Sequence, residues 1–316
     1  MHKTSLQSQE LQQLRDSLSA FDLVDLTETL GAPGRIIAID PRRSTITQNH
    51  KGWSYTSMIL EALNRGDIDE RTLIREFTSG RGGEAAAKIA HLLGLESEIV
   101  MPENITPERE ASLKKLSNLV LTPESDWLLG SMRYAHEASA AEAGSFLVNQ
   151  SANNDNVKGL ASVFSKAVRQ VQKKFGEVSY SVSTVGTGGT TSALGKCYPR
   201  ASINVGIDPQ RSPSTKSLKE GWHDRFVHHP HKYWGGGAGA ASPLIRDNIQ
   251  GIDQVRTVQW EAALDLAQWV GRRGLDVGLS TGGNLRAAID LVNELPGITV
   301  VTIIHDTSKA YRSMGL

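Results

Sequence analysis

Short apolar runs alternate with amphipathic segments along most of the chain. Runs typical of buried strands lie at residues 35–39, 98–101, 119–121, 180–185, 202–208, 277–280 and 298–304. Apolar residues at helical spacing predict helices at 11–21, 54–66, 106–116, 157–176, 260–274 and 282–295. This alternation predicts an α/β fold, with parallel sheets flanked by helices on both faces.

One long segment breaks the alternation. Residues 208–243 are rich in His, Gly, Pro and Ser and show little periodicity. The segment is too long for an ordinary connection, so we expect a lid or a binding loop. Four side chains in this segment are candidates for selecting the substrate: Trp222, His223, Tyr233 and Trp234. An equal alternative is that these side chains only pack in the protein interior.

Composition narrows the class of protein. The 316 residues allow one large or two modest domains, and 39% hydrophobic with 22% charged residues is ordinary for a globular protein. Lys+Arg and Asp+Glu both number 34, so no basic footprint for nucleic acid is present. The single cysteine, Cys197, and the absence of a signal peptide or of an apolar run of about 18 residues favour a cytoplasmic protein without a membrane partner.

Three glycine-rich stretches carry the candidate chemistry, at 77–90, 183–195 and 278–288. The sharpest, STVGTGGTTSALG at 183–195, follows a strand and opens a helix. Backbone N–H groups and the helix dipole at such a position favour an anion, typically a phosphate, and interleaved hydroxyls add donors. A tight turn without a ligand remains the alternative.

The kind of phosphate is constrained by spacing. A nucleotide P-loop needs Gly-Lys-Ser/Thr, and here Gly195-Lys196 is followed by Cys197. A dinucleotide loop stays open, because Gly186 and Gly188 are present and Asp208 follows about 20 residues later, although Thr191 occupies the last glycine position. The sequence HHPH at 228–231 lacks partners at zinc-site intervals, so no metal is expected.

Several motifs in order resemble one family. The stretches MPENITPEREASLKKLSNLVLTP (101–123), NQSANNDN (149–156), VGTGGTTSALG (185–195) and HDTSKAYRS (305–313) are similar to fold type II pyridoxal-phosphate (PLP) enzymes, in the cysteine synthase and cystathionine β-synthase branch. The resemblance implies a tryptophan synthase β-like fold and a homodimer. It also implies a larger PLP-binding domain, 1–50 plus 146–316, and a smaller mobile substrate-binding domain, 51–145.

The resemblance assigns roles residue by residue. Lys51 lies seven residues before Met58-Ile59, as the family's Schiff-base lysine does, although Gly52-Trp53 replaces the family's Asp-Arg. Ser280 matches the hydroxyl partner of the pyridine nitrogen. The PLP phosphate would be held by Gly186, Thr187, Gly188, Gly189 and Thr190, and the substrate carboxylate by Thr78, Ser79, Gly80, Gly82 and Gln150.

Arg81 departs from the family, which has Asn at this place in the loop facing the cofactor's phenolic oxygen. The resemblance therefore implies a cation near that oxygen or near an additional negative group on the donor or nucleophile. A side chain swung into solvent is the alternative.

The implied reaction is PLP-dependent β-substitution on O-acetylserine or O-phosphoserine through an aminoacrylate, by a transferase or lyase of amino-acid biosynthesis. Sulfide, a thiol, an amine or another nucleophile making a specialised amino acid all remain open. Two rival functions stay beside it: an NAD-dependent oxidoreductase that uses the Gly186 loop, and a catalytically degenerate PLP-fold protein with a regulatory role.

Overall fold

The fold is built on two separate sheets. The computed structural model describes residues 8–44, 46–198, 201–222, 231–233, 235–237 and 239–316. The larger sheet has six strands in the order β1-β2-β10-β7-β8-β9, namely β1 (Asp22–Asp25), β2 (Arg35–Asp40), β10 (Thr299–Ile303), β7 (Tyr180–Thr184), β8 (Ile203–Pro209) and β9 (Gln254–Val258). The smaller sheet has the order β5-β4-β3-β6, namely β5 (Asn118–Thr122), β4 (Ser97–Pro102), β3 (Leu73–Phe77) and β6 (Ser145–Leu147).

Nearly all strand pairs are parallel, as predicted. The exception is β1, which pairs with β2 antiparallel, with Asp22 opposite Asp40 and Asp25 opposite Ile37. The strands β2, β7 and β10 are buried over nearly their whole length, and apolar side chains predominate in β2 and β10, which is typical of a parallel sheet covered on both faces.

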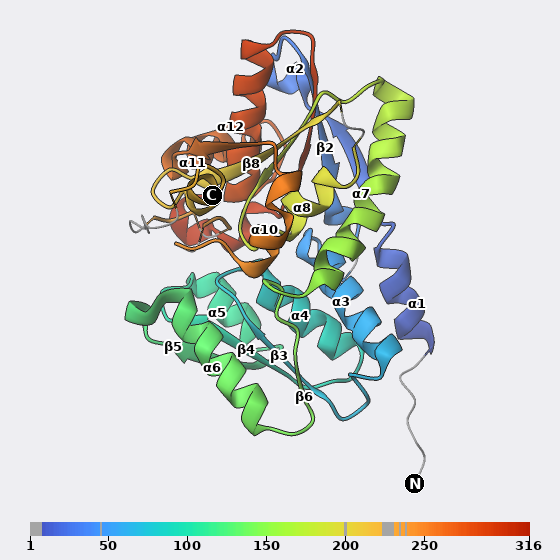
Figure 1. The fold of residues 1–316 in the computed structure, drawn as a ribbon, viewed down its shortest axis with the longest axis vertical. Helices are drawn as coiled ribbons and strands as arrows, with labels where there is room; N and C mark the ends of the chain where they lie inside the picture. Colours follow the sequence, from blue (N-terminus) through green and yellow to red (C-terminus); the bar gives the residue numbers. More distant parts are fainter. Residues whose placement is uncertain (1–7, 45, 199–200, 223–230, 234, 238) are drawn as a thin grey trace.

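Helices cover both faces of each sheet (Figure 1). Around the larger sheet lie α2 (Thr27–Leu30), α7 (Asn154–Phe175), α8 (Gly189–Gly195), α9 (Ser214–Lys219), α10 (Pro243–Asn248), α11 (Trp260–Gly271) and α12 (Leu279–Glu294). Around the smaller sheet lie α3 (Lys51–Arg65), α4 (Arg81–Leu92), α5 (Pro107–Leu113) and α6 (Trp127–Ala141), with α1 (Ser8–Ser17) packed on α3.

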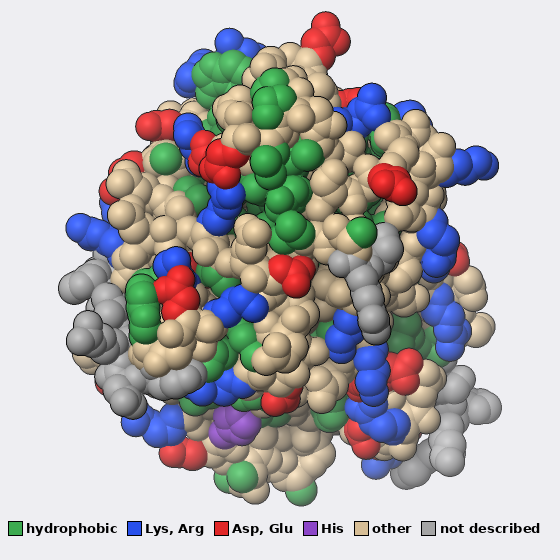
Figure 2. Space-filling model, turned by 45° about the horizontal axis from the view of Figure 1, so that its top comes forward, with side chains coloured by type: hydrophobic (Ala, Val, Ile, Leu, Met, Phe, Trp, Pro, Cys, Tyr) green, Lys and Arg blue, Asp and Glu red, His purple; other side chains and the backbone are tan. Residues whose placement is uncertain are grey.

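The apolar cores follow this layering. One core lies between the larger sheet and α11 with α12, and another lies between the same sheet and α7. A third joins α3, α4 and the smaller sheet, whose opposite face packs on α6 through Phe77, Val100 and Ala135. On the surface, basic and acidic side chains are interspersed over the face that Figure 2 shows.

One predicted strand is wrong. Residues 277–280 do not form a strand, because Gly278 is already the N-cap of α12, which begins at Leu279. The glycines at 282 and 283 lie inside this helix and serve close packing: an added Cβ would lie 2.0 Å from the Ala263 carbonyl oxygen at Gly282 and 1.9 Å from the Tyr233 hydroxyl at Gly283. The glycine stretch at 278–288 therefore opens a helix as predicted but follows no strand, and Ser280 in its first turn lines the cavity described below.

The departure at Gly52-Trp53 has a packing cause. A Cβ at Gly52 would lie 2.0 Å from Thr47 Oγ1, so the chain before α3 folds too closely for any other residue. Trp53 is buried, donates from Nε1 to the Ser17 carbonyl oxygen at 3.1 Å, and makes edge contacts with Phe21 and Phe164. These two residues anchor α3 between α1 and α7 and thereby fix the position of Lys51.

Candidate active site

All thirteen predicted site residues line one cavity of about 360 Å³. The cavity lies where α3, α4, α8 and α12 begin, together with residues 150–151, 231, 233, 235–237 and 240–243. It brings together Lys51, Thr78, Ser79, Gly80, Arg81, Gly82, Gln150, Gly186, Thr187, Gly188, Gly189, Thr190 and Ser280. Residues up to 229 positions apart, from Lys51 to Ser280, thus share one site.

Lys51 is placed by local hydrogen bonds at the start of α3. Its backbone N–H donates to Asn49 Oδ1 at 3.0 Å, and the Asn49 side chain donates in turn to the Thr47 carbonyl oxygen. Burial lowers the pKa of the Lys51 amine to about 8, against the opposing effect of Glu76. About a tenth of the amine is therefore neutral at pH 7, far more than for an exposed lysine, and the neutral form is the one that attacks a carbonyl or accepts a proton.

Glu76 is a buried carboxyl that sequence reasoning missed. It is fully buried at the end of β3 and accepts hydrogen bonds from the backbone N–H groups of Phe77 at 3.0 Å and Gln150 at 3.3 Å. Burial raises the pKa of Glu76 to about 8, although these hydrogen bonds and Lys51 oppose the shift. Since β3 also contains Arg75, an acidic residue in this strand gave no local signal of a buried site.

A histidine pair flanks the lysine and was also missed. His50 and His305 stack edge to face with ring centroids 4.3 Å apart, and His305 Nδ1 lies 3.2 Å from the ring nitrogens of His50. Burial, and after it the positive charge of Lys51, lowers the pKa of His305 to about 3. Burial, followed by the charges of His305 and Lys51, lowers the pKa of His50. Both imidazoles are therefore neutral and add no charge beside the amine.

The loop that opens α8 has the features of a phosphate cradle. Gly188 has φ of +87°, a conformation that favours glycine, and a Cβ at Gly186 would lie 2.6 Å from the Gly235 carbonyl oxygen. The Thr187 hydroxyl is buried without a hydrogen-bond partner in the described part of the chain. A buried hydroxyl beside helix-opening N–H groups fits a bound phosphate, so the residues here fit PLP.

The loop that opens α4 and Gln150 form a second polar subsite. A Cβ at Gly82 would lie 2.6 Å from both Gln150 Nε2 and the Tyr55 hydroxyl, so glycine lets these polar groups approach. Thr78 Oγ1 accepts from the Gly80 N–H at 3.1 Å and closes the turn. Asn156, which donates from Nδ2 to the Gln150 carbonyl oxygen at 2.8 Å, ties this subsite to the cradle.

Arg81 does not swing into solvent. Its side chain is 14% exposed, Nε donates to Asp306 Oδ2 at 2.9 Å, and Nη1 donates to Glu84. Burial lowers the pKa of Arg81, but Asp306 and Glu84 outweigh that effect and raise it, so the guanidinium is charged.

The segment 208–243 partly borders the cavity. His231, Tyr233 and residues 235–237 and 240–243 line it, in agreement with a binding loop. Tyr233 is fully buried and its hydroxyl lies 2.7 Å from Thr184 Oγ1, whereas Trp222 is 48% exposed and lies outside the lining. His223, Trp234 and residues 228–230 lie outside the described residues.

Asp208, the anchor of the dinucleotide alternative, has another role. Its Oδ2 accepts from the backbone N–H groups of Thr215 at 2.8 Å and Lys216 at 2.9 Å, at the start of α9. Asp208 is fully buried and is not part of the cavity wall. This arrangement does not present its carboxylate to a ribose, which argues against the NAD reading.

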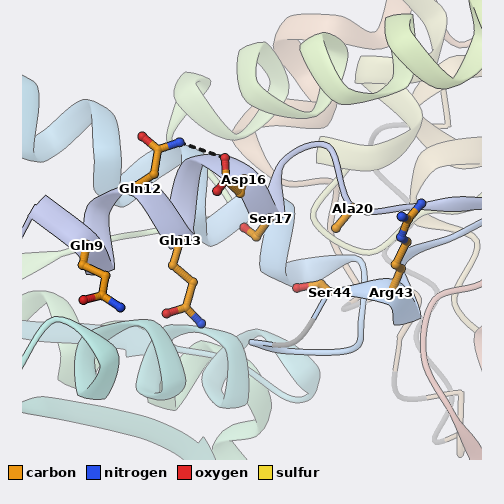
Figure 3. A pocket seen from close by; sticks show the side chains of 8 residues that line it. All are labelled: Gln9, Gln12, Gln13, Asp16, Ser17, Ala20, Arg43 and Ser44. Carbon is orange, nitrogen blue, oxygen red and sulfur yellow. Dashed lines mark hydrogen bonds between the residues drawn. The ribbon is translucent and has the colours of Figure 1, made fainter.

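A second hollow, of about 530 Å³, lies beside α1 and holds none of the predicted site residues. Figure 3 shows its polar lining, in which Gln12 Nε2 donates to Asp16 Oδ1 at 2.8 Å. In the described residues no group of three or more metal-ligating side chains comes together. Nor does any described helix combine the length and apolar character needed to cross a bilayer.

Known proteins resemble this chain over most of its length. Residues 47–306 match the family described as pyridoxal-phosphate dependent enzyme. Cysteine synthase B of Campylobacter jejuni is 32% identical over 263 residues, covering 82% of this chain and 84% of that protein. A cysteine synthase of Staphylococcus aureus is 32% identical over 269 residues, covering 82% of each chain.

Solved structures agree on the fold. A hydrogen sulfide-producing enzyme of Fusobacterium nucleatum superposes with a TM-score of 0.86 at 22% identity, covering 97% of this chain and 91% of that one. An O-acetylserine dependent cystathionine β-synthase of Helicobacter pylori gives 0.82 at 23% identity, covering 99% and 98%. The predicted tryptophan synthase β-like fold is confirmed.

Proposed function

This chain belongs to the family of pyridoxal-phosphate-dependent enzymes, and from that premise we infer that it catalyses β-substitution on an O-activated serine. The predicted PLP cofactor and the enzyme class are confirmed by the family match and by the cysteine synthase relatives. The observation that carries the proposal is the single cavity, in which a lysine of lowered pKa, a glycine cradle and a second polar subsite face one space.

The residues divide the work between cofactor and substrate. PLP, when bound, supplies an electron sink for negative charge at the substrate's Cα. We propose that the loop at 186–190 holds its phosphate, that the Ser280 hydroxyl faces its ring nitrogen, and that the Arg81 guanidinium lies near its phenolic oxygen. A serine hydroxyl does not keep a ring nitrogen protonated, which suits loss of a β-leaving group.

Lys51 is the proposed acid–base group. Its neutral amine takes the proton from Cα of the donor and later returns one to the same carbon, and a pKa of about 8 allows both directions near neutral pH. Gln150 and the loop at 78–82 bind the α-carboxylate and so orient the Cα–H bond toward the amine.

The donor and nucleophile are proposed by class. O-acetylserine or O-phosphoserine supplies a leaving group at Cβ, and a sulfur, nitrogen or oxygen nucleophile replaces it. The structural relatives include a cysteine synthase, an O-acetylserine dependent cystathionine β-synthase and an O-ureido-L-serine synthase, so more than one product is made on this fold.

The remaining predictions concern organisation. We propose a cytoplasmic homodimer with domains 1–50 plus 146–316 and 51–145. The strands favour this division except at its second boundary, because the larger sheet draws its strands from 22–40 and 180–303, whereas β6 of the smaller sheet continues to Leu147.

Reductive trapping tests the assignment of Lys51. Borohydride treatment of PLP-loaded protein, followed by peptide mass spectrometry, should place the cofactor on Lys51 and on no other lysine. Lys51→Ala should trap none, and Lys114→Ala, at a lysine whose side chain is 61% exposed, should trap as the wild type does. Trapping at another lysine would refute the assignment, and NAD binding without PLP binding would favour the oxidoreductase.

A further inference from the structure

Arg81 joins the two sheets through a buried ion pair. It is the first residue of α4, beside the smaller sheet, whereas Asp306 follows β10 of the larger sheet. The Nε–Oδ2 distance is 2.9 Å, and the side chains are 14% and 2% exposed. Glu84, one turn along α4, accepts from Nη1. Water and salt screen such a pair weakly, so the two carboxylates fix the guanidinium in one orientation.

Asp306 is itself fixed to the helix of the proposed cofactor partner. The Tyr311 hydroxyl donates to Asp306 Oδ2 at 3.0 Å, and the Gly278 N–H donates to the Asp306 carbonyl oxygen at 3.0 Å. A Cβ at Gly278 would lie 2.0 Å from Asp306 Oδ1, so this contact requires glycine. Gly278 caps α12 two residues before Ser280, and a shift of Asp306 would therefore disturb the start of that helix.

The segment after Asp306 continues along α5 of the smaller unit. Thr106 Oγ1 donates to the Ala310 carbonyl oxygen at 3.1 Å, and Ser313 donates to Glu108 from its N–H at 2.8 Å and from its hydroxyl at 2.9 Å. Glu108 and Ser313 meet at the surface, whereas the Arg81 pair is buried beside the cavity. The segment 306–313 therefore joins the larger sheet to α4 and α5 beside the smaller sheet, and the Arg81–Asp306 ion pair is the contact next to the cavity.

We propose that Arg81 and Asp306 form a latch that sets the position of the carboxylate-binding loop, residues 78–82, relative to the helix carrying Ser280. Arg81 acts through the loop, so in this role it is a positioning residue. The inference rests on the proposed function for its kinetic part, because only there does the loop bind a substrate. The spacing between carboxylate and cofactor subsites is what the latch controls.

Hydrogen exchange measured by mass spectrometry tests the latch in the PLP-loaded, full-length protein. Arg81→Asn should speed exchange in residues 78–84 and also in 306–313, and Asp306→Asn should do the same. The double variant should exchange no faster than either single variant, because one contact is lost in each case. Arg81→Lys should restore part of the protection.

Kinetics give the second readout. For O-acetylserine, Arg81→Asn should raise KM about tenfold or more while kcat changes by less than about threefold, as expected for a binding loop that is misplaced. Arg65→Asn is the matched control: the side chain of Arg65, paired with Asp155, is 46% exposed, so its loss should change neither exchange in these segments nor KM.

Unchanged exchange at 306–313 in Arg81→Asn, or additive effects in the double variant, would overturn the latch. If the wild type releases no leaving group from any activated serine, the proposed function fails, and the exchange data still decide for or against the latch.

Discussion

Replacing Glu76 with Gln tests the electrostatics beneath the lysine. In the cofactor-free protein the Glu76 carboxyl is fully buried and has a pKa of about 8, against 4.5 for an ordinary glutamate. Between these values the folded protein binds one more proton than the unfolded chain. The resulting stability is fully present below the unfolded pKa and is lost as pH rises toward 8.

The magnitude follows from the shift. Each pH unit in this window removes about 1.4 kcal/mol of the free energy of unfolding. Over the full interval from pH 4.5 to 8 the free energy of unfolding would fall by about 5 kcal/mol. This value is an upper limit, because water that enters around the ionised carboxylate reduces the cost of its burial. Lys51 acts in the opposite direction above pH 8, since burial lowers its pKa to about 8 from 10.5, and stability returns as pH rises further.

Urea unfolding of cofactor-free wild type and Glu76→Gln at pH 5.5, 6.5 and 7.5 measures this. The difference between the two proteins cancels the groups they share. We expect the free energy of unfolding of the wild type, relative to that of Glu76→Gln, to fall by about 3 kcal/mol between pH 5.5 and 7.5. A margin that stays constant with pH would show that Glu76 titrates as an ordinary carboxyl and would refute the reasoning.

Two further substitutions test the packing around the cavity. Gly189→Ala places a Cβ 2.6 Å from the side-chain amide of Asn156, which donates to the Gln150 carbonyl oxygen. We expect PLP affinity, measured by equilibrium dialysis, to fall about tenfold and the free energy of unfolding to fall by about 1–3 kcal/mol. An affinity equal to that of the wild type would contradict the phosphate cradle. Tyr233→Phe removes the hydroxyl that lies 2.7 Å from Thr184 Oγ1 and should lower Tm by about 2–4 °C in thermal unfolding, whereas an unchanged Tm would mean that this contact adds nothing.

The fold class was readable because its signals are local. Apolar runs and helical spacing located β2, β4, β5, β7, β8, β10 and most of the long helices to within a few residues. The antiparallel pairing of β1 left no such signal, because register depends on the partner strand. The error at 277–280 has a related cause: a buried helix start and a buried strand share the same apolar pattern over four residues.

Sequence motifs predicted the residues that line the site, but only the structure shows which residues pair with them. The glycine loops and Lys51 carry sequence patterns, whereas the partner of Arg81 lies 225 residues away, and His50 meets His305 across 255 residues. The sequence around Arg81 or His50 does not indicate which distant residue each one contacts. Glu76 was equally hidden, because its burial and its contact with Gln150 arise only when β3 and residue 150 meet.

The most direct test of the account is leaving-group release by the PLP-loaded protein. With O-acetylserine or O-phosphoserine and no nucleophile, the wild type should release acetate or phosphate in a burst of about one equivalent per site, with continuous turnover on adding sulfide. Lys51→Ala should show neither. PLP-loaded wild type that releases no leaving group from either donor would contradict β-substitution and favour a non-catalytic role for the site.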